Sequence, residues 1–168
     1  GSAALRSLSP STLSGLQTSQ LRQLATHQLS ALSIDQTQAL SSSQVVSLQS
    51  TQVQGLTDSQ LQGFTASQVS AMGSSNLAAL SATQLRSIDT ADLAALSTAK
   101  VTLLTTGVIA SLGTAQVQAL STSQVRALGS SQFGSLGTEQ VSALSSTQVG
   151  VIGSTNFLGL GTDIVSRL

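Results

Sequence analysis

The chain has 168 residues, 40% of them hydrophobic, which would suit one folded domain of ordinary size. Only 7% of the residues are charged and 2% are aromatic, whereas about a quarter of a typical soluble domain is charged. The formal net charge is zero, and six basic residues spread along the length exclude the dense positive field that nucleic-acid binding requires. Cysteine is absent, which excludes disulfides, thiolate metal sites and cysteine nucleophiles.

An eight-residue repeat runs through the whole sequence and predicts a solenoid. The 168 residues divide into 21 octads with no slip of phase, so octad 1 covers residues 1–8 and octad 21 covers residues 161–168. Position 8 is always apolar, and position 5 is apolar except at Thr37. Position 4 is usually Gln and position 7 is usually small, as in STSQVRAL at Ser121 to Leu128. We treat residues 1–168 as a single repeat array.

The first two octads indicate where helices begin. Gly1 and Ser2 are predicted to be an expression-tag remnant. Pro10, the single proline, stands at position 2 of its octad, which is the favoured first helical position if position 1 is the cap. Position 1 is mostly Ser, Thr or Gly, and Gln three residues later can complete a capping box. Gly at this joint is also expected to adopt the left-handed conformation that ends a preceding helix.

Charged residues follow the same polarity along the chain. All six acidic residues occupy positions 1 to 4 of their octads, and the arginines occupy position 6 or 7. Lys100, at position 4, is the exception. Acids near the start of a helix and bases near its end are favoured by the helix dipole, and a strand would impose no such asymmetry. Each octad is therefore predicted to form one short helix of about seven residues.

The predicted fold class is all-α, a solenoid or superhelix of short helices with one helix per octad. The alternative is a β-solenoid, with Val and Thr in short strands and Gln stacked in ladders. Apolar residues at positions 5 and 8 fit an i, i+3 helical face better than strict alternation. The sequence has no clean period above eight, so it leaves open the number of octads per coil and the handedness.

Stability is expected to come from stacking of octads, because isolated helices this short are marginal in water. The position 8 residues of successive octads would then form one apolar spine. Small residues at position 7 would let neighbouring helices approach closely. Representative residues of the predicted spine are Leu24, Leu32, Leu48, Leu96, Leu120, Leu128 and Leu144.

The segment Ser97 to Leu112, STAKVTLL followed by TTGVIASL, departs from the repeat. Lys100 and Val108 replace Gln at position 4, and Leu103 is large at a position that is normally small. This segment is either ordinary drift with a bulkier core or a contact patch or bend, with Lys100, Leu103, Val108 and Ile109 as the patch. Ile164 in the last octad departs in a similar way.

The sequence predicts no catalytic, cofactor-binding or metal-binding residues. His27 is the only histidine and is expected to be exposed in a first helical turn. Asp89 and Asp92 are explained as partners of a helix dipole rather than as an acid/base pair. Ser97 and Lys100 match the S-x-x-K element of serine acyl-transfer enzymes, but they are positions 1 and 4 of the repeat, and the S-D-N and K-T-G elements are absent.

The copies GTAQVQAL, STSQVRAL and GTEQVSAL resemble octad arrays of the LSTxQVxAL type in very large bacterial surface or secreted proteins. The resemblance covers the whole chain and brings no assigned catalytic residues. It implies an extracellular or cell-surface location in bacteria and an adhesin-like or fibrous setting.

These observations predict a structural or adhesive segment, such as a spacer, stalk or fibre, within a larger extracellular bacterial protein. Its expected partners are flanking repeats of the parent protein, or other copies joined end to end. The alternative is a recognition solenoid that binds a protein, a glycan or another surface through faces rich in Ser, Thr and Gln. We expect no enzyme activity, no cofactor, no nucleic-acid partner and no transmembrane segment, because no apolar run approaches about 18 residues.

Overall fold

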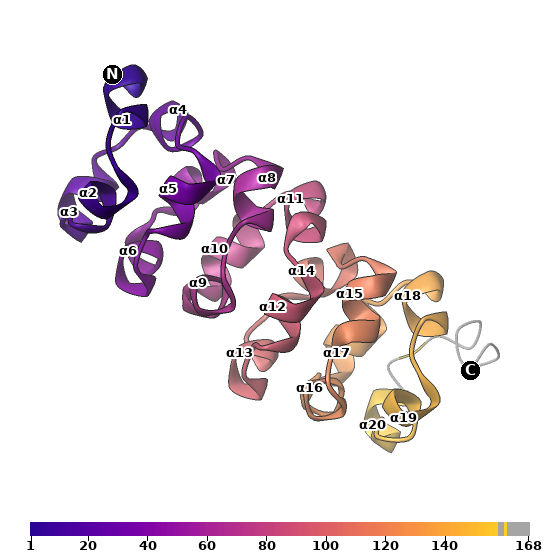
Figure 1. Ribbon diagram of the computed structural model, residues 1–168. Coiled ribbons are helices and arrows are strands. Elements are labelled where there is room, and N and C mark those ends of the chain that lie inside the picture. The colour runs from indigo at the N-terminus through magenta and orange to yellow at the C-terminus, as the bar shows by residue number, and fades with distance from the viewer. Residues whose placement is uncertain (158–159, 161–168) are drawn as a thin grey trace.

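The computed structural model describes residues 1–157 and 160, and this part of the chain is an elongated stack of short helices. Figure 1 shows the helices succeeding one another from α1 at one end to α20 at the other. Helix αn lies in octad n. The helices are α1 (Ser2–Arg6), α2 (Pro10–Ser14), α3 (Thr18–Arg22), α4 (Thr26–Leu29), α5 (Ile34–Gln38), α6 (Ser42–Ser47), α7 (Ser50–Gln54), α8 (Asp58–Gln62), α9 (Ala66–Ala71), α10 (Ser74–Ala79), α11 (Ala82–Ser87), α12 (Thr90–Ala94), α13 (Thr98–Thr102), α14 (Thr106–Ser111), α15 (Thr114–Ala119), α16 (Thr122–Ala127), α17 (Ser130–Gly134), α18 (Thr138–Ser142), α19 (Ser146–Val149) and α20 (Ser154–Phe157).

The prediction of an all-α solenoid is confirmed, and no strand occurs in the described part of the chain. The β-solenoid alternative is therefore wrong. Each helix has four to six residues, so the helices are slightly shorter than the expected seven. Some helices end at an extended residue at position 8, such as Leu128 with φ −63° and ψ 134°. Others end at a right-handed residue at position 7, such as Gly55 with φ −82° and ψ −8°, and an extended residue at position 1 follows. This extended corner turns the chain into the next octad.

Helix starts follow the predicted capping chemistry. Position 1 is the N-cap, and Pro10 occupies the first turn directly after Ser9. In octad 6 the Ser41 hydroxyl accepts from the Gln44 backbone N–H at 3.2 Å, and the Gln44 Oε1 accepts from the Ser41 backbone N–H at 2.8 Å. Two of the N–H groups that a helix start leaves without intrahelical partners are satisfied in this way. The capping box is therefore built as the sequence predicts.

Glycine at position 1 does not adopt the left-handed conformation that we expected. Gly113 has φ −74° and ψ 160°, Gly137 has φ −76° and ψ 164°, and no described glycine has positive φ. The helices end in the right-handed region and turn through an extended residue, which any L-amino acid adopts. Glycine at this corner is therefore not required by the backbone, which agrees with the Ser and Thr found at the same position in other octads.

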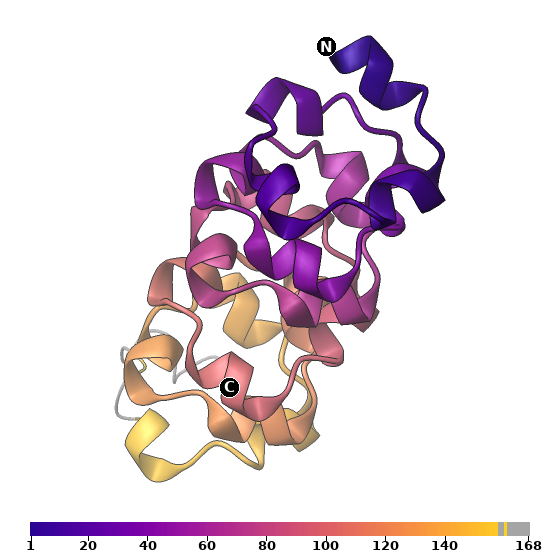
Figure 2. The same ribbon diagram turned by 90° about the vertical axis from the view of Figure 1, so that its left-hand side faces the viewer.

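Helices three octads apart pack side by side. α9 lies against α12, α12 against α15, and α13 against α16, and Figure 2 shows successive helices winding around the long axis. Position 7 lies at this contact. A Cβ atom on Gly63 would stand 2.5 Å from Cγ2 of Ile34, three octads earlier, and one on Gly55 would overlap Thr26. Small residues at position 7 thus allow close approach, as predicted.

The core is a continuous apolar interior built from positions 5 and 8. Of the predicted spine residues, Leu32, Leu48, Leu96, Leu120 and Leu128 are buried, and Leu24 and Leu144 are partly buried against the same core. Thr37, the polar exception at position 5, is also buried, and its hydroxyl donates to the carbonyls of Ser33 and Ile34 at 3.1 and 2.8 Å. Its hydrogen bonds offset the cost of burying a hydroxyl group.

Candidate functional site

The most distinctive chemical feature is a row of buried side-chain amides at position 4. Gln124 shows the pattern: its Nε2 donates to the Leu96 carbonyl at 2.7 Å and the Leu93 carbonyl at 3.1 Å, and its Oε1 accepts from the Ser121 backbone N–H at 2.8 Å. The amide is 1% exposed and uses its donors and its acceptor at once. We call this row the amide ladder. Its buried members are Gln36, Gln44, Gln52, Gln60, Gln68, Asn76, Gln84, Gln116, Gln124, Gln132, Gln140, Gln148 and Asn156.

Every ladder amide reaches the octad four places earlier. The acceptor that recurs is the position 8 carbonyl 28 residues before the amide, as in Gln44 to Leu16 at 2.8 Å and Gln148 to Leu120 at 2.7 Å. Most ladder amides donate in addition to the position 5 carbonyl 31 residues before, as Gln44 does to Leu13 at 3.0 Å. Since helices pack three octads apart and amides reach four octads back, one coil contains between three and four octads.

The position 8 carbonyl depends on this amide. It belongs to the extended corner residue, and no backbone N–H of the described residues donates to Leu96, Leu112 or Leu120 at that oxygen. A buried carbonyl without a donor costs about 1–3 kcal/mol, so the ladder solves a problem that the corner itself creates. Asn can take the same place, because Asn76 Nδ2 donates to the Leu48 carbonyl at 3.1 Å.

The ladder removes most position 4 amides from the surface. These amides are at most 8% exposed, so they are not available to the recognition face rich in Ser, Thr and Gln that is the alternative function. Ser and Thr at positions 1 to 3, with Gln20 and scattered glutamines at other positions, remain for such a face. The sequence predicted the capping role of the position 4 glutamines within each octad. It did not predict their hydrogen bonds to an earlier coil.

The segment Ser97 to Leu112 splits between core and surface. Val108 and Ile109 are 3% and 1% exposed, so they belong to the core and are not accessible to a partner. Leu103 is 63% exposed, and Lys100 is partly exposed. Of the four residues of the predicted contact patch, only these two reach the surface. Ile164 lies outside the described residues.

The remaining candidate groups have structural partners. The Ser97 hydroxyl accepts from the Lys100 backbone N–H at 3.2 Å as the cap of α13. Burial, and then the negative charge of Asp89, raise the pKa of Asp92 above its usual value. His27 is exposed in α4. In the described part of the chain no group of three His, Cys, Asp or Glu side chains is placed to hold a metal ion.

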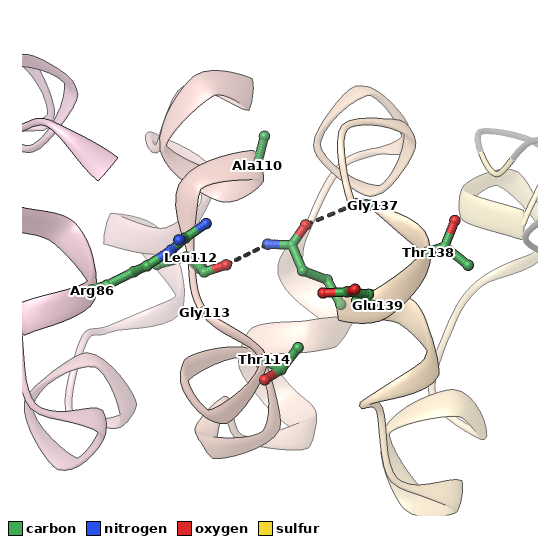
Figure 3. A pocket seen from close by; sticks show the side chains of 9 residues that line it. Arg86, Ala110, Leu112, Gly113, Thr114, Gly137, Thr138 and Glu139 are labelled. Atoms are coloured by element: carbon green, nitrogen blue, oxygen red, sulfur yellow. Dashed lines mark hydrogen bonds between the residues drawn. The ribbon is translucent and has the colours of Figure 1, made fainter. Parts of the chain in front are cut away.

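A shallow groove of about 620 Å³ lies where octads 11, 14, 15 and 18 meet, and Figure 3 shows its lining. Arg86 and Glu139 contribute opposite charges, and Thr114 and Thr138 contribute hydroxyls. Gln140 also lines the groove, where its amide donates to the Leu112 carbonyl and accepts from the Gly137 N–H, as the dashed lines in Figure 3 show. The groove therefore lies over one bond of the amide ladder.

No described helix exceeds six residues, and none has the length and apolarity needed to cross a membrane.

Comparison with known proteins gives one match. Residues 69–106, 101–130 and 109–146 each match the family model of the ALTTAQ repeat. The matches overlap in tandem between residues 69 and 146, as expected for a periodic array. No curated protein matches the chain. Residues 69–146 are thus similar to ALTTAQ repeats, and the chain is a repetitive structural segment with one short helix per octad.

Proposed function

We propose that this chain is a non-catalytic spacer or fibre segment of a larger bacterial surface or secreted protein, and that it extends by stacking further octad coils on its ends. The observation that carries the proposal is the amide ladder. Each buried amide in one octad donates to carbonyls of the octad four places earlier, and the same relation repeats along the array. Such a structure has no natural limit of length, because every added octad meets the same acceptors.

The N-terminal face supports extension by another coil. Gln20 and Gln28 accept from their own N-cap N–H groups at 2.8 Å, as ladder members do. Their amide nitrogens donate to no group in the described structure, and Gln20 is exposed. Leu8, Leu16 and Leu24, in octads 1 to 3, are only partly buried. This face therefore presents amide donors beside apolar side chains, which matches the carbonyls and apolar residues of an octad coil.

The occupant that we propose for this face is the last coil of a second copy, joined end to end. Burial of the partly exposed leucines would supply the main free-energy gain, at about 25 cal/mol per Å² of apolar area removed from water. The amides would fix the register of the two coils, because each needs a corner carbonyl at the correct place. A cell-surface location and an adhesin-like role are part of the proposal and are supported by the resemblance of the octads.

Sedimentation across a concentration series tests the proposal, with the double variant Gln20→Glu/Gln28→Glu. Glutamate keeps the oxygen that accepts from the N-cap but loses the amide donor and adds a negative charge facing carbonyls. The matched control is Gln23→Glu/Gln38→Glu, which makes the same charge change at exposed side chains outside the ladder. We expect growth in particle size with concentration for the unmodified chain and the control, and a monomer for the ladder variant.

Two results would overturn this proposal. One is that the unmodified chain stays monomeric at every concentration. The other is that the unmodified chain associates and Gln20→Glu/Gln28→Glu does not weaken this association. Far-UV circular dichroism of each variant checks that helix content is unchanged. A loss of association can then be attributed to the substituted side chains and not to unfolding.

A further inference from the structure

The amide ladder is interrupted in three successive octads, 12 to 14. Position 4 holds Asp92, Lys100 and Val108 there, and none of these side chains donates a hydrogen bond to the octads four places earlier. The position 8 carbonyls that an amide would reach belong to Phe64, Met72 and Leu80. They receive no donor from the described residues, although all three residues are at most 7% exposed.

The interruption changes how firmly the two ends of the array are joined. At the boundary between residues 120 and 121, four ladder amides connect octads on the two sides, those of Gln124, Gln132, Gln140 and Gln148. At the boundary between residues 88 and 89 only Gln116 does so, through the Leu85 and Ile88 carbonyls, both at 2.8 Å. Between residues 80 and 81 only Gln84 does so. Octad 11, Ser81 to Ile88, is thus held by one amide on each side.

Helix packing is weakened at the same place. Among the described helices, every pair three octads apart packs closely except α10 and α13. α10 contacts α14 instead. Leu103 in octad 13 stands at position 7, where Gly55 and Gly63 permit close approach in octads 7 and 8. Its side chain is 63% exposed. A bulky residue at this contact position prevents the close approach that a small residue allows, and its side chain is left mostly exposed.

We propose that octad 11 is a built-in mechanical boundary, created by the missing ladder amides of octads 12 to 14, and that it divides the array into two cooperatively folded blocks, residues 1–80 and 89–157. Under load or mild denaturant the blocks separate at this boundary before either of them unfolds. In a linear array, stability is the sum of octad and interface contributions, so apart from fraying at the ends the interior boundary with the fewest bonds opens first. The inference holds whether or not the chain serves as a fibre.

Besides the chain itself and the helix contacts of α9 with α12, of α11 with α14 and of α10 with α14, two polar links cross between residues 88 and 89. They are the Gln116 amide and the bond from Arg86 Nε to the Ser111 carbonyl at 3.2 Å, which is exposed. Gln116 is therefore the residue whose loss should uncouple the blocks. Gln140 is its matched control, because it also follows a Gly N-cap and donates to two carbonyls, but at least two other amides cross each of the boundaries that it spans.

Native-state hydrogen exchange by mass spectrometry, followed at low denaturant concentrations, tests the inference on the whole chain. We expect residues 33–80 and 113–152 to exchange as two groups with different denaturant dependence. In Gln116→Leu we expect exchange in octads 8 to 10 to rise about tenfold, whereas in Gln140→Leu we expect these octads to change by less than about twofold.

A repaired variant keeps the inference falsifiable if Gln116→Leu fails to fold. Asp92→Gln/Lys100→Gln/Val108→Gln places the consensus residue at all three positions and should merge the two groups into one. A single exchange group in the unmodified chain would overturn the inference. So would two groups that persist unchanged in the repaired variant, or an equal effect of Gln116→Leu and Gln140→Leu on octads 8 to 10.

Discussion

The individual octads of two regions, octads 15 to 19 and octads 12 to 14, share one helical register and the same apolar positions. The two regions nevertheless differ in how they are joined to the preceding coil. In octads 15 to 19 every position 4 residue is a buried glutamine that donates to carbonyls of the octad four places earlier. In octads 12 to 14 the helices form equally well, but no side chain makes these bonds. Helix formation within an octad and attachment between coils are therefore separate properties of the repeat.

The largest expected effect comes from removing a ladder amide within the regular region. Gln124→Leu would leave the Leu93 and Leu96 carbonyls without their side-chain donor, so we expect a loss of about 3 kcal/mol in the free energy of unfolding. Val108→Leu, at the same position of octad 14, removes no hydrogen bond of the side chain and adds one methylene to a buried site, so it should cost only about 1 kcal/mol. Urea unfolding followed by circular dichroism measures both. Equal losses would show that the amide bonds contribute nothing specific.

The second effect concerns the contact at position 7. Gly55→Leu would force a large side chain against Thr26, and we expect it to destabilise the array by about 2 kcal/mol. Leu103→Ala, at position 7 of octad 13, should change stability by less than about 0.5 kcal/mol because the side chain is mostly exposed. Thermal unfolding of the two variants compares them. A large loss in Leu103→Ala would contradict the loose packing of α13 against α10.

The third effect is a pH dependence confined to the interrupted region. Burial and Asp89 raise the pKa of Asp92 above 3.8, so the folded state binds the proton more tightly than the unfolded state. Its contribution to stability is fully present below pH 3.8 and is lost as the pH rises through the folded-state pKa. The change should be below about 1 kcal/mol, because the side chain is only partly buried.

Asp92→Asn isolates this contribution. Neither α9 nor α15, the helices packed against α12, contains a titratable residue, and Asp89 is the charged neighbour on its own octad. The variant should therefore lose the pH dependence above pH 3.8 and gain an amide in the place that Asn76 occupies in octad 10. Denaturant midpoints measured between pH 3 and pH 7 give the slope. If the pH dependence of stability persists in Asp92→Asn, it comes from other carboxylates.

The smallest effect tests the corner. A Cβ atom on Gly137 would have no neighbour closer than 3.7 Å, and the residue is extended, so Gly137→Ser should fit. The new hydroxyl can cap α18, and we expect a gain of a few tenths of a kcal/mol. Denaturation midpoints of the variant and the unmodified chain would show it. A loss of more than about 1 kcal/mol would mean that the corner requires glycine after all.

Much of the fold follows from the sequence, because it depends on local chemistry. Pro10 and the Ser or Thr caps mark helix starts, and the i, i+3 spacing of apolar residues selects the helix over the strand. The coil geometry does not follow from the sequence, because it depends on hydrogen bonds between residues 28 and 31 positions apart. The eight-residue pattern does not indicate which octads these bonds join. A hint was present: the capping box accepts Glu as readily as Gln, yet no octad has Glu at position 4. Only an amide also supplies donors.

The interrupted region was visible in the sequence at Lys100, Leu103 and Val108, but its structural meaning was not. Val108 would belong to a surface patch only if position 4 of its octad were exposed, but the structure buries this residue. Val108 is therefore a core residue that lacks a bond, rather than a contact residue.

The most direct measurement is the exchange of glutamine side-chain amide protons, followed by NMR on the unmodified chain. If Nε2 groups join the coils, those of Gln124 and Gln140 will exchange slowly and will show couplings to the Leu96 and Leu112 carbonyls. The exposed Gln23 and Gln118 will exchange as fast as free glutamine. Fast exchange at every glutamine would contradict the ladder and, with it, the separation of helix formation from attachment between coils.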